Sequence, residues 1–393
     1  MFWLESICLL GILCSAIYWL ASLACTVAFF HRCPPPRAPF QPPVSILKPM
    51  RGLDDDLEEN LRAFCDQDYP DYQILFGVEG ADDPCAPVLR RIIAEFPDKD
   101  IELLVCGANH GANRKINNLR AMLPKARHAV LVLADSDIRV CSDYLERIVA
   151  PLADETVGLV CSPYRWKAPR TLPAAIEALT FCAEFIPSVL LVERFEGMKF
   201  ALGATIAVRR RCLDEVGGFD RIHDYLADDY MLGKLIRERG HKLVLSDYVV
   251  DLIHHHTSWK RMMEHQVRLV RTYRVCRPTG FFFSIFSHGT TWATILLLLS
   301  HFSPLAWSVW CVVVGMRVVT SAIYLLNYFP DLLTTGYLWL LPVRDWLASV
   351  WWLAAYTGNR VRWRGAYFTL TSDGKLHSIP ESLAVPPETV KVE

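Results

Sequence analysis

The chain has 393 residues, a formal net charge of −1, a hydrophobic fraction of 52% and a mean hydropathy of +0.21. A chain so close to neutral has no broad basic field, so we expect no nucleic-acid partner. The hydrophobic fraction is high for a soluble enzyme and is concentrated toward the two ends, which predicts membrane segments there.

The first predicted element is a membrane helix. Ser6–Phe30 contains no charged residue and is long enough to cross a bilayer at about 1.5 Å per residue. A signal peptide is the alternative, but Glu5 and no basic residue precedes the apolar run. We therefore expect an anchor over residues 1–32 and a Pro-rich linker over 33–43. Three basic residues follow the anchor, namely His31, Arg32 and Arg37. Basic residues next to a membrane helix favour the cytosolic side, so we expect the next domain in the cytosol.

The cysteines indicate the same compartment. Thirteen are scattered along the chain and none forms a C-x-x-C pair. This distribution argues against a disulfide framework or a zinc site and predicts reduced, mostly buried thiols.

Strand and helix patterns alternate from Val44 to about Tyr248, within a catalytic domain expected over 44–275. The predicted strands are 44–47, 72–78, 101–105, 129–134, 159–162 and 206–209, and the predicted helices are 57–66, 86–95, 115–123 and 143–152. Such alternation predicts an α/β fold with a mainly parallel sheet, flanking helices and ligands at the strands' carboxyl ends. The apolar stretch Leu172–Val192 contains acids and prolines, so we expect it on the sheet or in the membrane interface.

The C-terminal part returns to the membrane, with membrane helices expected over 276–365 and a tail over 366–393. Phe281–His301 and Leu305–Leu326 are apolar and predict a helical hairpin in which Arg317 snorkels or faces protein.

A third apolar stretch, Tyr337–Tyr356, is interrupted by Pro342, Arg344 and Asp345. If all three stretches span, the segment Arg360–Lys375 lies outside, although its arginines favour the cytosol. A re-entrant or interfacial third stretch removes this conflict, and we favour it.

Paired carboxylates are the main chemical signal. Asp135-Ser136-Asp137 follows the apolar run 129–134 directly, and Asp228-Asp229 comes about ninety residues later. Asp135 and Asp137 share one face of the strand end, where they suit Mg²⁺ or Mn²⁺. A D-x-D triplet alone is usually a surface turn, but its place after a buried strand favours a site. A separate carboxylate such as Asp229 is suited to general-base chemistry.

Three further motifs are candidates for nucleotide binding. Asp83, after the strand 72–78, either meets a base or ribose or belongs to an Asp-Pro turn. Lys115 and Asn118 lie at a predicted helix start, which suits a diphosphate but also occurs as a solvated helix end. Gly203 allows close approach of a ligand or simply tight packing.

Two motifs contain basic side chains, and the sequence leaves more than one role open for each. Gln266, Arg268 and Arg271 form Q-x-R-x-x-R, which predicts a clamp on a departing diphosphate, an anchor on anionic headgroups, or both. His254–His256 is a histidine triplet, but neighbouring histidines cannot all face one ion. We expect this triplet to be solvated or to face a phosphate.

In this order, the motifs resemble the ceramide glucosyltransferase family, inverting membrane enzymes with a GT-A catalytic fold. The resemblance covers roughly Val44–Arg271 and rests on Leu47-Lys48-Pro49, Gly52, Asp68-Tyr69-Pro70, Asp82-Asp83-Pro84, Lys115-Ile116-Asn117-Asn118, Asp135-Ser136, Ile138-Arg139-Val140, Gly217-Gly218, Asp228-Asp229-Tyr230 and the Gln/Arg segment. The chain departs from the family at Thr272, where the signature has Trp, at Asp228, where it usually has Glu, and at Asp137, where the animal enzymes have Gly.

The resemblance implies a UDP-sugar donor and a membrane lipid hydroxyl as acceptor. It places Asp83 on the nucleotide, Asp135 with Asp137 at the metal and diphosphate, and Asp229 as the base. Leu226–Gly233 and Arg274–Gly280 resemble the hopanoid-associated bacterial members, so glucose or N-acetylglucosamine and ceramide or hopanoid stay open. A processive polysaccharide synthase and an inactive nucleotide-binding membrane scaffold are the alternatives.

Overall fold

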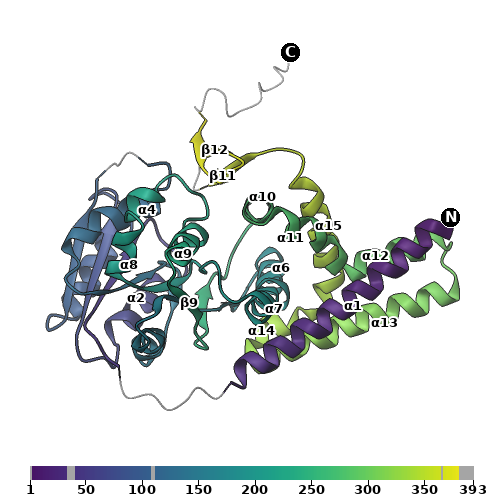
Figure 1. The fold of residues 1–393 in the computed structure, drawn as a ribbon, viewed down its shortest axis with the longest axis horizontal. Coiled ribbons are helices and arrows are strands. Elements are labelled where there is room, and N and C mark those ends of the chain that lie inside the picture. Colours follow the sequence, from purple (N-terminus) through teal and green to yellow (C-terminus); the bar gives the residue numbers. More distant parts are fainter. Residues whose placement is uncertain (1, 33–39, 108–110, 364–365, 380–393) are drawn as a thin grey trace.

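The computed structural model describes residues 2–32, 40–107, 111–363 and 366–379 (Figure 1). Most of the predicted linker (33–39) and the end of the tail (380–393) lie outside these residues.

A seven-stranded sheet forms the core of the α/β part, with the strand order β3-β2-β1-β4-β8-β6-β9. Its strands are β1 (Val44–Pro49), β2 (Tyr72–Val78), β3 (Asp100–Val105), β4 (Val130–Ala134), β6 (Val157–Cys161), β8 (Thr205–Arg209) and β9 (Lys242–Leu245). All pairs are parallel except those that β8 makes with β4 and β6. The predicted mainly parallel sheet is confirmed.

Helices cover both faces of this sheet because its strand side chains alternate between two apolar clusters. On β4, Val130 and Val132 belong to one cluster, and Leu131 and Leu133 belong to the other. The first cluster is covered by α2 (Leu57–Cys65), α3 (Ala86–Glu95) and α5 (Tyr144–Val149), and the second by α4 (Arg114–Met122), α8 (Arg210–Glu215) and α9 (Asp228–Glu238).

A small second sheet was not predicted. It consists of β5 (Ile138–Arg139), β10 (Val250–Ile253) and β7 (Tyr164–Lys167), in the order β5-β10-β7. Because β10 pairs with β5 directly after the D-x-D triplet, the histidine triplet that follows β10 comes close to the carboxylates.

Two helical segments connect the α/β part to the membrane helices. The first runs through α6 (Leu172–Thr180), a π-helical turn (Phe181–Phe185) and α7 (Ile186–Glu196). It is long and apolar enough to span a membrane, but 67% of its most apolar window is buried inside the protein. The second is α10 (Trp259–Cys276), which carries the Gln/Arg motif.

The remaining helices form the membrane part at the right of Figure 1. They are α1 (Phe2–Phe30), α11 (Pro278–Phe283), α12 (Gly289–Leu299), α13 (Pro304–Ile323), α14 (Leu332–Gly336) and α15 (Leu341–Ala354). By length and composition, helices in the ranges Trp3–Phe30 and Pro304–Tyr328 can also cross a bilayer, and Pro278–Leu299 is a pair bent by 53°. Arg317 on α13 faces protein and is 2% exposed, which confirms one of its two predicted placements.

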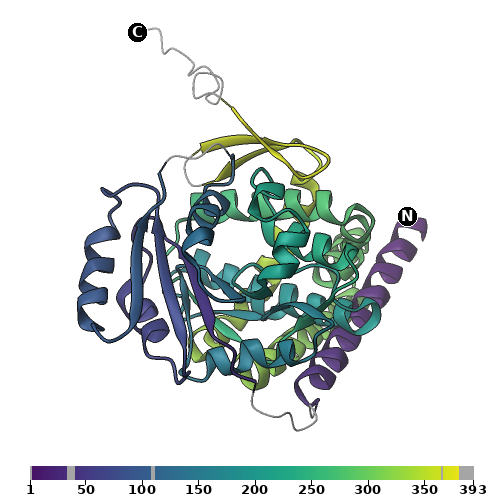
Figure 2. The same ribbon diagram turned by 60° about the vertical axis from the view of Figure 1, so that its left-hand side comes forward.

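The chain continues into a third sheet, also not predicted. Its antiparallel strands are β11 (Arg360–Trp363), β12 (Ala366–Leu370) and β13 (Leu376–Ser378). β11 therefore falls within the range 276–365 that we expected to be membrane helix. Figure 2 shows this yellow sheet lying across the top of the molecule, over α/β elements and α10.

Candidate active site

The centre of the candidate site is the carboxyl end of β4, where Asp135 begins the D-x-D triplet. The Asp135 N–H donates to the Ala204 carbonyl at 3.1 Å. Beneath it, the fully buried Lys48 at the end of β1 donates from Nζ to the Asp135 carbonyl at 2.6 Å. Burial lowers the pKa of Lys48 to about 7 against the opposing effect of Asp135. Lys48 thus fixes the backbone that carries the first carboxylate.

Lys115 connects the D-x-D triplet to the later acid pair. It lies in the first turn of α4, which Asn113 caps by accepting from the Ile116 N–H at 3.2 Å. Lys115 Nζ lies 2.6 Å from Asp135 Oδ1 and 3.9 Å from Asp228 Oδ2. Burial alone would lower the pKa of Lys115, but these two carboxylates raise it above its usual value.

Asp229 follows Asp228 in the first turn of α9 and faces Gly203. A Cβ atom added at Gly203 would lie only 2.7 Å from Asp229 Oδ2. Burial and the charge of Asp228 raise the pKa of Asp229 to about 7, with Lys115 opposing them. A carboxyl group with this pKa is suited to accept a proton near neutral pH.

Asp137 pairs with His254, a residue for which the sequence predicted contact with either solvent or a phosphate. His254 Nε2 lies 2.7 Å from Asp137 Oδ2, and its ring packs against Trp166 with centroids 4.6 Å apart. Burial opposes protonation, but Asp137 raises the pKa of His254 to about 9. His255 faces elsewhere, since its ring nitrogens contact Asp56 and the Ala168 carbonyl. Of the histidine triplet, His254 is thus the residue that contacts the D-x-D carboxylates.

The two candidate nucleotide residues near β2 are held by backbone groups. Asp83 Oδ1 accepts from the Gly52 N–H at 2.8 Å and the Cys85 N–H at 3.0 Å. Burial opposes the shift, but these bonds lower the pKa of Asp83. Asn118 donates to the Gly77 carbonyl at 3.2 Å. Both residues therefore lie near the carboxyl ends of β1 and β2. Asp135 lies at the carboxyl end of β4, the strand that pairs with β1.

The Gln/Arg motif makes different contacts. Gln266 is buried and donates to Glu177 on α6 at 3.3 Å. Arg268 lies over the Trp363 ring at 5.8 Å, and Arg271 donates to the carbonyls of Arg360 and Ala354. In the structure both arginines contact the C-terminal part of the chain. A role on a diphosphate stays a prediction for all three residues.

The donor set at the strand end fits a hard divalent cation. Asp135 and Asp137 supply carboxylate oxygens, which Mg²⁺ and Mn²⁺ prefer. Each already pairs with a cationic side chain, Lys115 or His254, and Asp228 and Asp229 add further negative charge on the other side of Lys115. Positive charge is therefore stabilised at this place.

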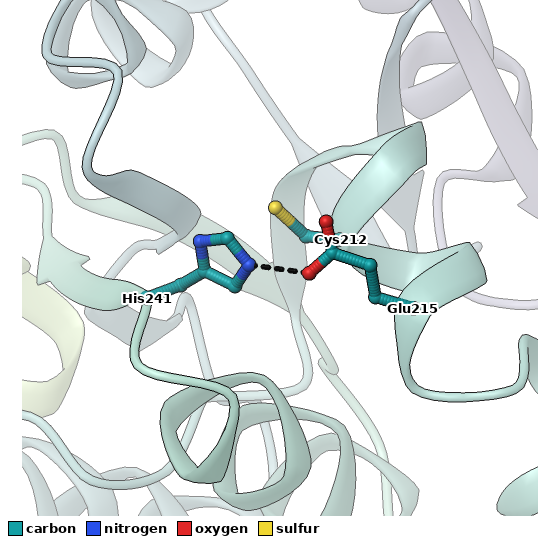
Figure 3. Close-up of side chains that lie close together, drawn as sticks. All are labelled: Cys212, Glu215 and His241. Carbon is teal, nitrogen blue, oxygen red and sulfur yellow. Dashed lines mark hydrogen bonds and ion pairs between the residues drawn. The ribbon is translucent and has the colours of Figure 1, made fainter.

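A second group of metal-ligand side chains lies on elements that contribute nothing to this centre (Figure 3). Ligand atoms of Cys212, Glu215 and His241 lie within 4.8 Å of one another. His241 Nε2 is already 2.6 Å from Glu215 Oε2, and burial raises the pKa of the Cys212 thiol. A surface histidine–glutamate pair accounts for this group, and we assign it no metal.

The sheet and the position of the carboxylates define a GT-A type glycosyltransferase fold. The structure is similar to that of a mannosyltransferase from Pyrobaculum calidifontis in complex with GDP-Man and Mn²⁺, with a TM-score of 0.50 and 20% identity. The match covers 90% of this chain and 97% of that one.

Residues 7–376 match the family model of glycosyl transferase family 21, and the chain belongs to this family. Its curated relatives include ceramide glucosyltransferase 3 of Caenorhabditis elegans, 27% identical over 61% of this chain and 55% of the relative. Ceramide glucosyltransferase 1 of the same organism is 29% identical over 53% and 45%. The chain thus spans about half the length of these relatives.

Proposed function

We propose that this chain is an inverting glycosyltransferase that moves one hexose from a UDP-sugar to a hydroxyl group of a membrane lipid. Family membership, the names of the curated relatives and the GT-A fold support the class. The observation that carries the proposal is Asp229, a carboxyl group with a pKa of about 7 next to Gly203, in a row of charges that leads through Lys115 to Asp135.

Each residue has a task in this mechanism. Asp229 removes the proton of the acceptor hydroxyl as the oxygen attacks the anomeric carbon from the face opposite the leaving UDP, which inverts the configuration. Lys115 fixes the orientation of Asp135 and Asp228 and offers positive charge to the donor's phosphates. Asp135 and Asp137 would hold Mg²⁺ or Mn²⁺, which stabilises negative charge on a leaving diphosphate when bound. Asp83 is proposed to contact the nucleoside.

The acceptor is proposed to be ceramide-type or hopanoid, presented from the bilayer on the cytosolic side. The apolar helices next to the site support an amphiphile whose polar head reaches Asp229 while its tail stays in the membrane. The relatives' names favour ceramide and glucose.

The test uses the full chain in nanodiscs with UDP-glucose or UDP-N-acetylglucosamine and either ceramide or a polyhydroxylated hopanoid. We expect one donor and one acceptor to give a product with one added hexose and the opposite anomeric configuration, read by mass spectrometry and NMR. UDP release that is equal with and without lipid, with no glycolipid formed, would contradict the proposal. A ladder of products with several sugars would favour the processive synthase.

A further inference from the structure

The C-terminal sheet packs on the segment that leads into the acid pair. The Leu226 N–H donates to the Gly374 carbonyl at 3.2 Å, and the Leu376 N–H donates to the Asp224 carbonyl at 2.7 Å. Leu226 is also buried in an apolar cluster with β11, β12 and β13 side chains, including Phe368. Because α9 begins only two residues later, at Asp228, these contacts fix the chain just before the acids.

The same segment is held from its other side by the residues before α4. Ala112 N–H donates to Asp224 Oδ1 at 3.0 Å, while Asn113 Nδ2 donates to the Tyr225 carbonyl at 2.9 Å and to Asp228 Oδ1 at 3.1 Å. The segment 224–228 is therefore enclosed between the C-terminal sheet and the start of the helix that carries Lys115.

A cavity lies where the sheet meets that helix. Its volume is about 290 Å³, and its walls come from two parts of the chain. The α/β part supplies polar groups, among them Arg114, Asn117 and Asn118, and the C-terminal sheet supplies Tyr367 and Phe368. The inner side of the sheet thus borders the helix end proposed to receive the donor.

The helix α10, which carries the Gln/Arg motif, contacts strand β11 of the C-terminal sheet. Arg362 forms an ion pair with Glu264 at 2.8 Å, Arg268 lies over Trp363 at 5.8 Å, and Arg271 donates to the Arg360 carbonyl. The helix α10 and the segment before α9 therefore bind the small sheet directly, and Ala112, before α4, packs against its apolar cluster.

We propose that β11–β13 is a positioning element of the catalytic site, which holds Asp228 and Asp229 in register with Lys115. The sheet consequently lies on the same side of the membrane as the α/β part. The positioning role rests on the proposed function, whereas the membrane side does not.

This arrangement fixes the parity of the membrane crossings. The chain leaves the α/β part after α10 and returns to it at β11, so it crosses the bilayer an even number of times between them. Two crossings account for this, namely the bent pair Pro278–Leu299 and the helix Pro304–Tyr328. Ser15 Oγ donates to the Phe286 carbonyl at 2.6 Å, and a Cβ at Gly11 would meet the Trp292 ring, so α1 and α12 run antiparallel. The turn 300–303 therefore lies near the N-terminal end of α1, away from the α/β part (Figure 1).

The helix α15 does not cross in this arrangement. With 14 residues it measures about 21 Å, less than the ~30 Å of a bilayer core. For Leu172–Glu196 the parity of the crossings decides, and not the length. The strands before and after this segment, β7 and β8, both belong to the α/β part. One uninterrupted helix that leaves and re-enters the same side crosses zero times.

The membrane side is tested with three single epitope tags in the full chain: one in the turn at Asp98–Lys99, one between His301 and Phe302, and one after residue 393. In sealed vesicles probed with a protease that cannot cross the bilayer, we expect the first and third tags to be cleaved or protected together and the second to behave oppositely. A tag after residue 393 that behaves like the tag at 301 overturns the inference. This readout needs no sugar transfer, so it is independent of the proposed function.

The positioning role is tested by Leu376→Ala, with His377→Ala as the matched control. Leu376 is buried against the cluster, and its neighbour on β13 is exposed. We expect Leu376→Ala to lower kcat by about 10- to 100-fold with a small change in the donor KM, since slight misplacement of a catalytic group has costs of this size. His377→Ala should keep the wild-type kcat, and Leu376→Met should recover most of it. Equal kcat values for the two alanine variants, or a loss that only follows the folded fraction, overturns the positioning role.

Discussion

At the scale of single residues, burial and neighbouring charges together set the pKa of Asp229. The carboxyl group lies between the like charge of Asp228, which raises its pKa, and Lys115, which lowers it. The same lysine is held by Asp135 at 2.6 Å. The proposed base and Asp135, proposed to hold the cation, are thus coupled through one ammonium group.

Asp229→Asn is expected to separate chemistry from binding. The amide has nearly the same shape as the carboxylate but cannot accept the acceptor's proton. General-base catalysis contributes about 10²–10⁴-fold, so kcat should fall by at least that factor. Affinity for the UDP-sugar, measured by calorimetry, should change little.

Asp228→Asn is the control at the neighbouring position and should cost less. If Asp228→Asn is the inactive variant and Asp229→Asn the active one, the base is Asp228. Full activity in both variants means that the proton leaves by another route.

The activity should depend on pH through Asp229. If Asp229 is the base that we propose, its ionised form is the active one, and kcat should fall as pH decreases through about 7, the pKa of Asp229. Cation binding at Asp135 and Asp137 moves this limb lower, since positive charge favours the carboxylate. Asp228→Asn removes the charge that raises the pKa, so its limb should lie at lower pH than that of the wild type. A pH–kcat profile of the two proteins measures the difference, and identical limbs would mean that the charge of Asp228 does not raise the pKa of the titrating group.

The sequence identified part of this centre in advance. Asp135 and Asp137 follow a buried strand, and their place at the strand end could be predicted from a pattern of neighbouring residues. The pairing of Asp137 with His254 could not, because it depends on β10 docking beside β5 across more than a hundred residues. The hydrogen bond from Lys48 to the Asp135 carbonyl could not be predicted either, because it depends on the pairing of β1 with β4.

At the scale of elements, five helical segments meet in one buried ion network. Arg317 on α13 pairs with Glu184 in the π-helical turn at 2.8 Å and with Asp345 on α15 at 3.3 Å. Arg344 adds a contact to Asp345 at 2.9 Å. Thr290 on α12 and Tyr18 on α1 donate to the acids at 2.7 and 3.0 Å. Because all the charges are paired inside the protein, the network fixes how the membrane helices meet α6–α7.

Asp345→Asn should therefore destabilise the protein strongly. The substitution leaves two buried arginines with one acid, and removal of one member of a buried pair typically costs about 3–5 kcal/mol. Glu193→Gln is the matched control, because its partner Arg32 is 46% exposed and such surface pairs contribute about 0–1 kcal/mol. Thermal unfolding in detergent should show a large decrease for the first variant and almost none for the second. Equal decreases would mean that the buried network does not hold the helices together.

The predictability of the elements followed their length and the range of their contacts. β2 and α3 have the predicted bounds, and most other elements of the α/β part differ by one to three residues, because each has its own apolar pattern. The helices α8 and α9 were not predicted. The short strands β5, β7, β9 and β10 and the sheet β11–β13 were also missed. With two to five residues each, they carry almost no periodic signal and form only where another segment offers an edge.

At the scale of the whole molecule, the outer part of the membrane bundle has a small apolar core of its own. α1, α12 and α13 share this cluster around Trp19, Ala293 and Val313. The larger cluster on one face of the sheet extends into the inner part of the bundle, where it includes Phe29, Leu325 and Trp351. This division between outer and inner bundle predicts that damage to the outer part affects access of the lipid more than binding of the nucleotide.

Gly289→Leu tests this division. A Cβ at Gly289 would lie 2.7 Å from both Ser15 Cβ and the Trp19 ring, so a leucine forces α1 away from α12 at a contact that depends on a small residue. Gly315→Leu on α13 is the control, because no residue that the structure describes lies within 4 Å of the Cβ position there. We expect Gly289→Leu to lower the thermal midpoint and the rate with bilayer-embedded acceptor, while UDP affinity stays near that of the wild type and Gly315→Leu changes none of the three. If Gly289→Leu loses UDP binding together with lipid transfer, the two parts fold as one unit and the bundle supports the nucleotide site directly.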